Sequence, residues 1–374
     1  MKLICDRSAL VDKLAILARG VSTRSALPVL SGILLQASEG RLDLFSTDME
    51  LSIKASLATA IEREGEIVVP ARLFADVVRN LPGEQVAIEA GEAAVKVSAG
   101  RAEFSLNAWS ASDFPQTSTF DTSEAFAMGR GPFVETLTKA GRAASRDETR
   151  PILTGVLMTI LGDTLKMVAT DSYRLAVKET KLERALETEV HAIVPVRALG
   201  EVARLAAAMG DGDIEVAIGE NQALFKLSDP TGDVWIASRL IDGQFPNYQQ
   251  VLPKEHATRA IVDREELLRA VRPAALLTRE STKIVKLHVG GEGIAGIQVT
   301  AVSDLGDHQS EVDATVEGDG TTVAFNAGYL TDVLQNVAAD EFAIELNGPL
   351  SPGVFKPADG RDYIHVVMPV RTAS

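Results

Sequence analysis

The same pattern of residues occurs more than once along the 374-residue chain, and this repetition constrains the fold more than any other feature. The stretch Leu27–Leu35 (LPVLSGILL) returns at Arg150–Met158 as RPILTGVLM, and Ser46–Leu51 (STDMEL) returns at Ala169–Leu175 as ATDSYRL. The equivalent prolines and the equivalent aspartates of the two copies are both separated by 123 residues. A shared offset of this kind indicates homologous units within one chain.

A third copy of the pattern is weaker but lies in the same order. Asp263–Leu268 resembles Asp6–Val11, and Ala301–Asp304 resembles the Thr-Asp turn of the other copies. The chain is also too long for one ordinary core, and its length suggests two or three domains. We therefore predict three repeated domains, at residues 1–124, 125–252 and 253–374.

Each unit has the same predicted order of helices and strands. Apolar residues at helical spacing predict an opening helix, and a second helix follows a Val-Pro or Phe-Asn landmark. Alternating segments such as 41–45, 51–55, 85–89 and 94–98 predict strands. The helical segments are 8–19 and 71–80 in the first unit, 133–145 and 197–208 in the second, and 263–277 and 327–337 in the third. The predicted fold class is α+β, with two helices packed on antiparallel β-sheet in each domain.

Positive charge is concentrated on the helical segments, although the chain as a whole carries −15. Counted with their flanking residues, the six segments together carry +5, so the remainder carries −20. A basic surface built by repetition would attract phosphates without reading bases. For any one helix, a solvated face decorated with basic residues is the alternative interpretation.

Four stretches resemble the bacterial DNA polymerase III beta subunit, the sliding clamp, and the resemblance covers the whole chain. They are Arg24–Leu30 (RSALPVL), Ala169–Ala176 (ATDSYRLA), Leu240–Tyr248 (LIDGQFPNY) and Tyr363–Arg371 (YIHVVMPVR). The resemblance implies a head-to-tail homodimeric ring of six domains, with helices lining the hole and sheets at the rim. It also implies a non-catalytic processivity factor without cofactors. Its partners would be double-stranded DNA, the replicative polymerase alpha subunit, an ATP-dependent clamp loader and other proteins with a clamp-binding motif.

Matching to this family, together with the helix charges, gives candidate DNA contacts. They are Arg24, Arg72, Lys139, Arg142, Arg146, Arg150, Arg197, Asn326 and Tyr329. Pro151 and Ile152 stand where the family has tyrosines, which removes support for aromatic stacking on single-stranded DNA there. A surface ion pair is the alternative role for each single arginine.

The resemblance also implies a peptide-binding pocket between the second and third domains, with Met368 as a deformable wall. The matching residues are Leu153, Thr170, Ser172, Tyr173, Arg174, Leu175, Pro246, Val251, Leu350, Val366, Val367, Met368, Pro369, Val370 and Arg371. Ordinary core packing is the alternative role for Leu153, Leu175 and Val366. The last three residues, 372–374, extend beyond the usual end of the family and could partly cover the groove.

A dimer interface follows from the same matching. Phe104 and Leu106 of the first domain match positions that face Leu276 and Leu277 of the third, with domain-internal packing as the alternative. Asp304, Asp307 and Glu311 are candidates to pair across this interface with Arg101. Glu103 stands where a basic residue is commoner, which weakens that pairing.

Enzymatic functions find little support in the sequence. Gly291–Gly296 spells a dinucleotide-binding glycine pattern, but a predicted strand follows it instead of a helix, so we expect a hairpin turn. A hydrolase with paired carboxylates would need acids that converge in one cleft. Asp48 and Asp171 are instead equivalent residues of two repeats, for which turn capping is the expected role. A protein scaffold that does not bind DNA is the third possibility.

Other signals place the chain in a reducing compartment without metal chemistry. Cys5 is the single cysteine, and the five histidines have no zinc-type spacing. No sequence of the GxxxxGK[ST] kind occurs, so a separate loader would have to supply ATP hydrolysis. No apolar run approaches the roughly 20 residues of a membrane span, and the N-terminus meets a charge too early for a signal peptide. We expect a cytoplasmic protein.

Overall fold

The computed structural model describes residues 1–22, 26–115, 125–278, 283–337, 339–360 and 362–372. By packing, the chain divides into two compact units: unit 1 (residues 1–134 and 197–240) and unit 2 (135–196 and 241–374). The central repeat therefore contributes to both units. Its strands pair with those of the repeat before it in unit 1 and of the repeat after it in unit 2.

The six predicted helices are confirmed in the described residues, two in each repeat. The first repeat contains β1 (Lys2–Asp6), α1 (Arg7–Leu17), β2 (Gly32–Ser38), β3 (Arg41–Thr47), β4 (Leu51–Ala58), β5 (Ala60–Arg63), β6 (Gly65–Pro70), α2 (Ala71–Asn80), β7 (Gln85–Ala90), β8 (Ala94–Ala99) and β9 (Ala102–Asn107). The central repeat contains β10 (Phe126–Gly129), α3 (Arg130–Gly141), β11 (Gly155–Thr170), β12 (Arg174–Pro195), α4 (Val196–Ala208), β13 (Asp213–Ile218), β14 (Gln222–Asp229) and β15 (Gly232–Arg239).

The third repeat contains β16 (Thr258–Asp263), α5 (Arg264–Leu277), β17 (Ile284–Val289), β18 (Ile297–Ser303), β19 (Gly306–Val312), β20 (Ala314–Gly318), β21 (Thr321–Asn326), α6 (Ala327–Asn336), β22 (Glu341–Leu346), β23 (Gly353–Pro357) and β24 (Tyr363–Val367). Short 3-10 helices occur at η1 (Pro28–Ser31), η2 (Ala111–Asp113), η3 (Pro151–Thr154) and η4 (Tyr248–Gln250). The helix predicted at 133–145 starts three residues earlier than expected.

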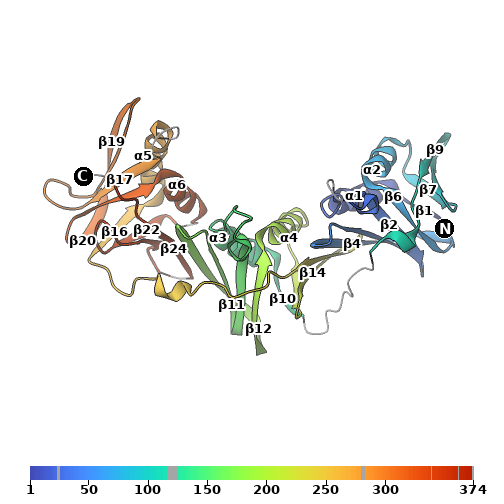
Figure 1. The fold of residues 1–374 in the computed structure, drawn as a ribbon, viewed down its shortest axis with the longest axis horizontal. Helices are drawn as coiled ribbons and strands as arrows, with labels where there is room; N and C mark the ends of the chain where they lie inside the picture. Colours follow the sequence, from blue (N-terminus) through green and yellow to red (C-terminus); the bar gives the residue numbers. More distant parts are fainter. Residues whose placement is uncertain (23–25, 116–124, 279–282, 338, 361, 373–374) are drawn as a thin grey trace. The chain divides into compact units, whose positions relative to one another are not determined.

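Unit 1 contains an eight-stranded sheet, β10-β13-β14-β15-β4-β3-β2-β6, and a five-stranded sheet, β5-β1-β7-β8-β9. Strand β15 pairs antiparallel with β4, which joins the central repeat to the first in one sheet. Helices α1 and α2 lie side by side on one face of this sheet (Figure 1). Helix α2 buries Phe74, Val77 and Val78 because these residues recur at helical spacing on one face.

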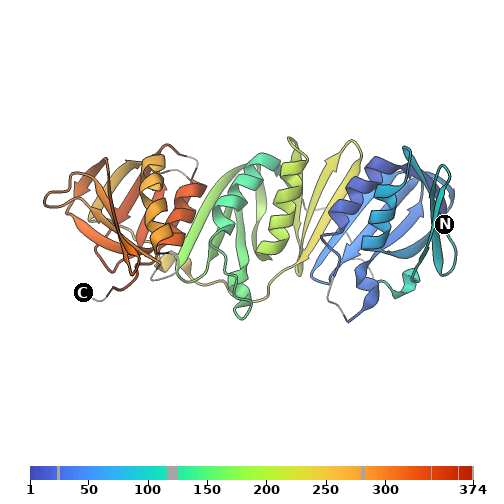
Figure 2. The same ribbon diagram turned by 90° about the horizontal axis from the view of Figure 1, so that it is seen from above.

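Unit 2 repeats this plan with a seven-stranded sheet, β11-β12-β24-β23-β22-β16-β20, and a four-stranded sheet, β19-β18-β17-β21. Here β12 pairs with β24, so the central repeat is joined to the third. Helices α5 and α6 lie side by side (Figure 2). The Asp263 carboxylate caps α5 by accepting a hydrogen bond from the Glu266 N–H at 2.8 Å, as Asp6 caps α1.

An arginine at the first position of the first helix ties the two helices of each repeat together. Its guanidinium donates to carbonyl oxygens in or beyond the last turn of the second helix. The contacts are Arg7 to Arg79 and Gly83, Arg130 to Met209, and Arg264 to Leu334 and Ala339, at 2.8–3.3 Å. A cation there meets carbonyls without intrahelical partners and the negative end of the helix dipole.

Candidate functional site

An apolar pocket of about 270 Å³ opens in unit 2. It is lined by Leu153, Thr170, Ser172, Arg174, Leu175, Pro246, Asn247, Tyr248, Val251, Val366 and Met368. Leu175 of β12 lies directly opposite Val366 of β24, so both side chains point to the same face of the sheet. Around them, a buried cluster that includes Val168 and Val354 forms the floor, against which Tyr248 and Val251 pack.

The turn between β11 and β12 forms one side of the pocket. The Asp171 carboxylate accepts hydrogen bonds from the N–H groups of Tyr173 and Arg174, both at 2.9 Å. The Thr170 hydroxyl donates to the Arg174 carbonyl at 2.7 Å and accepts from the Ser172 N–H at 3.1 Å. These bonds hold Ser172 at a φ of +80°, a left-handed conformation that is strained for a residue with a side chain.

The same capping occurs in the first repeat and confirms the predicted role of the repeated aspartate. The Asp48 carboxylate accepts from the N–H groups of Glu50 and Leu51 at 3.1 and 2.8 Å, and Met49 has a φ of +77°. Each aspartate serves its own turn, one in unit 1 and one in unit 2. Turn capping accounts for both carboxylates. Neither Asp48 nor Asp171 is then needed as the catalytic acid or base that the hydrolase interpretation requires.

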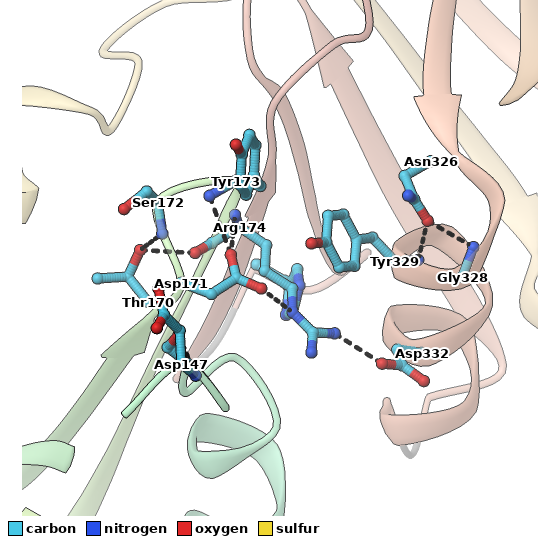
Figure 3. A network of polar contacts seen from close by, with 12 residues as sticks. Asp147, Thr170, Asp171, Ser172, Tyr173, Arg174, Asn326, Gly328, Tyr329 and Asp332 are labelled. Carbon is cyan, nitrogen blue, oxygen red and sulfur yellow. Dashed lines mark hydrogen bonds and ion pairs between the residues drawn. The ribbon is translucent and has the colours of Figure 1, made fainter. Parts of the chain in front are cut away.

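Arg174 connects this turn to helix α6 (Figure 3). Its Nε lies 3.2 Å from Asp171 Oδ2, and its Nη1 lies 2.6 Å from Asp332 Oδ2. The guanidinium stacks on the Tyr329 ring, 4.7 Å from the ring centroid, where cation–π attraction adds to the ion pairs. Burial, followed by the Asp171 charge, raises the pKa of Tyr329.

Arg150 is held by two side chains, one of which lines the pocket. Its Nε lies 2.8 Å from Asp147 Oδ2, and its Nη1 donates to the Ser172 hydroxyl at 3.1 Å. Hydrogen bonds from the Thr149 hydroxyl and from Arg150 lower the pKa of Asp147, so the partner of Arg150 stays charged. The predicted DNA contact Arg150 is therefore hydrogen-bonded to a residue that lines the pocket.

Nine of the predicted pocket residues line the cavity, and six do not. Tyr173, Leu350, Val367, Pro369, Val370 and Arg371 are not in the lining. Val367 is fully buried on the opposite face of β24, whereas Tyr173 and Leu350 are exposed. Asn247 and Tyr248 also line the pocket but were not among the predicted residues, although both belong to the stretch Leu240–Tyr248 that carries the resemblance.

The predicted DNA-binding cations fall into two groups. Arg72, Arg142 and Arg146 are exposed on or just after helices. Lys139 pairs with Glu135 at 2.5 Å and is 11% exposed, and Arg197 pairs with Asp48 at 2.5 Å while remaining 57% exposed. Arg24 lies outside the described residues.

Asn326 and Tyr329, two further predicted DNA contacts, and Lys13, one of the positive charges counted on the helices, make contacts within the protein. Asn326 caps α6 by accepting from the N–H groups of Gly328 and Tyr329, whose ring lies against Arg174. Lys13, counted among the positive charges of the helices, is 1% exposed and donates to the Gly232 carbonyl at 3.0 Å. The exposed positive charge of α1 is therefore smaller than the sequence count suggests.

The predicted dimer residues lie on one edge strand of a sheet and at the end of one helix. Phe104 is 43% exposed on β9, an edge strand of its sheet, and Leu106 on the same strand is buried. Leu276 is 70% exposed at the end of α5, beside a cavity of about 430 Å³ between α5 and α6. Leu277 is half-buried. Glu103 pairs with Lys96 at 3.4 Å within its own sheet.

The glycine pattern, the single cysteine, metal binding and membrane spans can be compared with the described part of the chain. Gly291–Gly296 joins β17 to β18, which pair antiparallel, so the predicted hairpin turn is confirmed. Burial raises the pKa of the Cys5 thiol to about 12, which keeps it protonated. Within the described ranges, no cluster of three or more His, Cys, Asp or Glu side chains could hold a metal. None of the helices there combines the length and apolar character needed to cross a bilayer.

Comparison with known proteins agrees with this arrangement along the whole chain. Models of the DNA polymerase III beta subunit match in order: its N-terminal domain at residues 1–118, its central domain at 131–247 and its C-terminal domain at 249–371. The beta sliding clamps of Synechococcus elongatus and Staphylococcus aureus are 34% and 30% identical to this chain, and each comparison covers 100% of both chains. The crystal structure of the DNA polymerase sliding clamp from Bacillus subtilis has a TM-score of 0.94 at 28% identity, again over 100% of both chains. The chain therefore belongs to the DNA polymerase III beta subunit family, the beta sliding clamps.

Proposed function

We propose that two copies of the chain close head to tail into a six-domain ring that encircles duplex DNA and keeps DNA polymerase on its template. Family membership makes the chain a processivity factor without catalysis of its own. The ring is supported by the open edges of β9 and β19, since edge strands present unpaired backbone groups to a partner. A heterologous contact whose rotation closes yields a ring instead of a filament.

The proposed DNA contacts are electrostatic and independent of sequence. Arg72, Arg142, Arg146 and Arg197 offer exposed guanidinium groups that can meet phosphates. Arg197 would exchange Asp48 for a phosphate, because its ion pair leaves 57% of the side chain exposed. Few contacts over an acidic chain imply weak adhesion, which permits sliding. The proposal places the protein in the cytoplasm, together with the chromosome.

The apolar pocket of unit 2 is the observation that carries the tethering function. Its floor of Leu175, Val366 and Val251, with Met368 as an adaptable wall, fits a short peptide with apolar anchor residues. We propose that the replicative polymerase alpha subunit, the ATP-dependent clamp loader and other proteins with a clamp-binding motif dock here. A polymerase held beside its template rebinds from a high effective concentration, which explains processivity without base contacts.

Retention on nicked circular DNA tests the topological link. The protein is incubated with a clamp loader and ATP, separated from free protein by gel filtration, and examined again after the circle is cut. Retention on circles and release from cut DNA supports the ring. Equal retention on both forms would mean that binding is adhesive. Failure to associate, with a loader that is active on another clamp, would refute the proposal.

A further inference from the structure

We propose that Asp332, on helix α6 of the third repeat, is a positioning residue of the peptide pocket and acts through Arg174. The inference rests on the proposed role of the pocket as a partner site. Asp332 does not line that pocket, whereas Arg174 does. The ion pair between them joins the wall of the pocket to a helix on the other face of the sheet.

The register of β12 and β24 sets this geometry. Leu175 and Val366 face each other on the pocket side of the sheet, so the neighbouring pair, Arg174 and Val367, points to the opposite face. The Arg174 guanidinium there reaches Asp332 at 2.6 Å and lies over the Tyr329 ring (Figure 3). Residue 174 thus borders the pocket while its side chain holds α6.

Burial makes the Arg174 guanidinium dependent on its carboxylate partners. The Arg174 side chain is 11% exposed and that of Asp171 12%, whereas Asp332 is 34% exposed. A nearly desolvated guanidinium needs its charged partners, because an uncompensated buried charge is strongly unfavourable. Without Asp332, Arg174 would depend on Asp171 alone.

Asp171 is the link back to the pocket. One carboxylate oxygen caps the turn through the N–H groups of Tyr173 and Arg174, and the other accepts from Arg174 Nε. Besides burial, the charge of this carboxylate raises the pKa of the Tyr329 phenol, whose ring lies against Arg174. A guanidinium that moves toward Asp171 would compete for these bonds. It would thereby displace the turn that carries Thr170 and Ser172, both of which line the pocket.

The first repeat supplies an internal comparison. The position equivalent to Arg174, 123 residues earlier, is Leu51, and Asp48 there bonds Arg197 of α4 directly. Both turns are therefore linked to the second helix of the following repeat, but with different chemistry. The arginine between turn and helix is a feature of the turn that borders the pocket.

A double-mutant cycle tests the inference. The purified alpha subunit of the organism's own replicative polymerase is immobilised, and its affinity for the clamp is measured by surface plasmon resonance. We expect Asp332→Asn to weaken binding about 5- to 20-fold, within the usual range for coupling between residues in one network. Asp332→Glu should restore part of the loss. Asp313→Asn, an exposed aspartate of the same repeat, is the matched control and should bind like the wild type.

The background of Arg174→Met separates positioning from general destabilisation. If Asp332 acts through Arg174, adding Asp332→Asn to Arg174→Met changes the affinity no further. An equal loss in both backgrounds, or no loss in either, would overturn the inference. If Asp332→Asn does not fold, Asp332→Glu is measured in the same two backgrounds. An equal loss of affinity in both, or no loss in either, would again overturn the inference. Met368→Ala separates the pocket assignment from the positioning role of Asp332. If Met368→Ala binds polymerase normally, the pocket assignment itself fails. If Met368→Ala loses binding while Asp332→Asn binds like the wild type, only the positioning role is refuted.

Discussion

Replacement of Phe104 by alanine should weaken the proposed dimer while leaving each subunit folded. Phe104 projects from β9, the edge strand of the five-stranded sheet, and is 43% exposed in the single chain. A phenylalanine this exposed contributes less to the core than a buried one, so its truncation costs the fold little. In the ring, the same surface would be covered by the partner copy.

The expected magnitude follows from the exposed area. A phenylalanine presents about 200 Å², so 43% exposure offers about 85 Å² to a partner. At ~25 cal/mol per Å², burial of this area contributes about 2 kcal/mol to each interface. That free energy corresponds to a factor of about 30 in an equilibrium constant. A head-to-tail ring has two identical interfaces, so the loss is counted twice and the dimer dissociation constant should rise by about 10³.

Sedimentation velocity over a dilution series measures the dissociation constant, and thermal unfolding at high protein concentration checks the fold. Leu73→Ala is the control, because Leu73 is 50% exposed on α2 and is not part of the predicted interface. We expect the control to dissociate like the wild type. A Phe104→Ala dimer as tight as the wild type would mean that β9 lies outside the interface, and the edge-to-edge ring would have to be abandoned.

Three further predictions concern the pocket and the stability of the fold. Met368→Ala, which removes the deformable pocket wall, should lower polymerase affinity at least about tenfold in surface plasmon resonance and leave the dimer intact. Arg264→Met should lower the free energy of unfolding in urea by about 1.5–3 kcal/mol, because two carbonyls at the end of α6 lose a charged donor; the exposed Arg269→Met on the same helix should not. Burial, reinforced by the Arg174 charge, lowers the pKa of His365 from 6.5 to about 3. Between these values the unfolded chain binds a proton that the folded chain does not, so stability falls as the pH drops below 6.5, by up to ~1.4 kcal/mol per unit. Urea unfolding of His365→Gln across this range should lack this contribution, and identical pH profiles would refute it.

Local periodicity was sufficient to predict the helices and many strands. Helix α2 was predicted at 71–80 and is observed there, since its buried residues recur at helical spacing within ten residues. The strand predicted at 94–98 lies within β8, whose alternate residues are buried. In both cases, the information that determines the element is contained within the element itself.

Pairing between repeats could not be predicted in the same way. Alternation indicates which face of β4 or β12 is buried, but many strands share that pattern and none identifies its partner. The pairs β4–β15 and β12–β24 are therefore visible only in the structure. The burial of Lys13 has the same origin, because its acceptor, the Gly232 carbonyl, belongs to the next repeat and lies 219 residues away in sequence.

In the Thr-Asp turn, the contacts of one carboxylate oxygen could be predicted from the sequence, and those of the other could not. One carboxylate oxygen of Asp48 and of Asp171 caps N–H groups two and three residues ahead, a local role that the repeated motif indicated. The other oxygen differs between the turns. In Asp48 it accepts from Arg197, 149 residues away, whereas in Asp171 it accepts from Arg174, which continues to Asp332, 158 residues further. Two equivalent residues with the same local function thus acquire different long-range partners. Of these two links, the one through Arg174 ends at a turn whose residues Thr170 and Ser172 line the pocket.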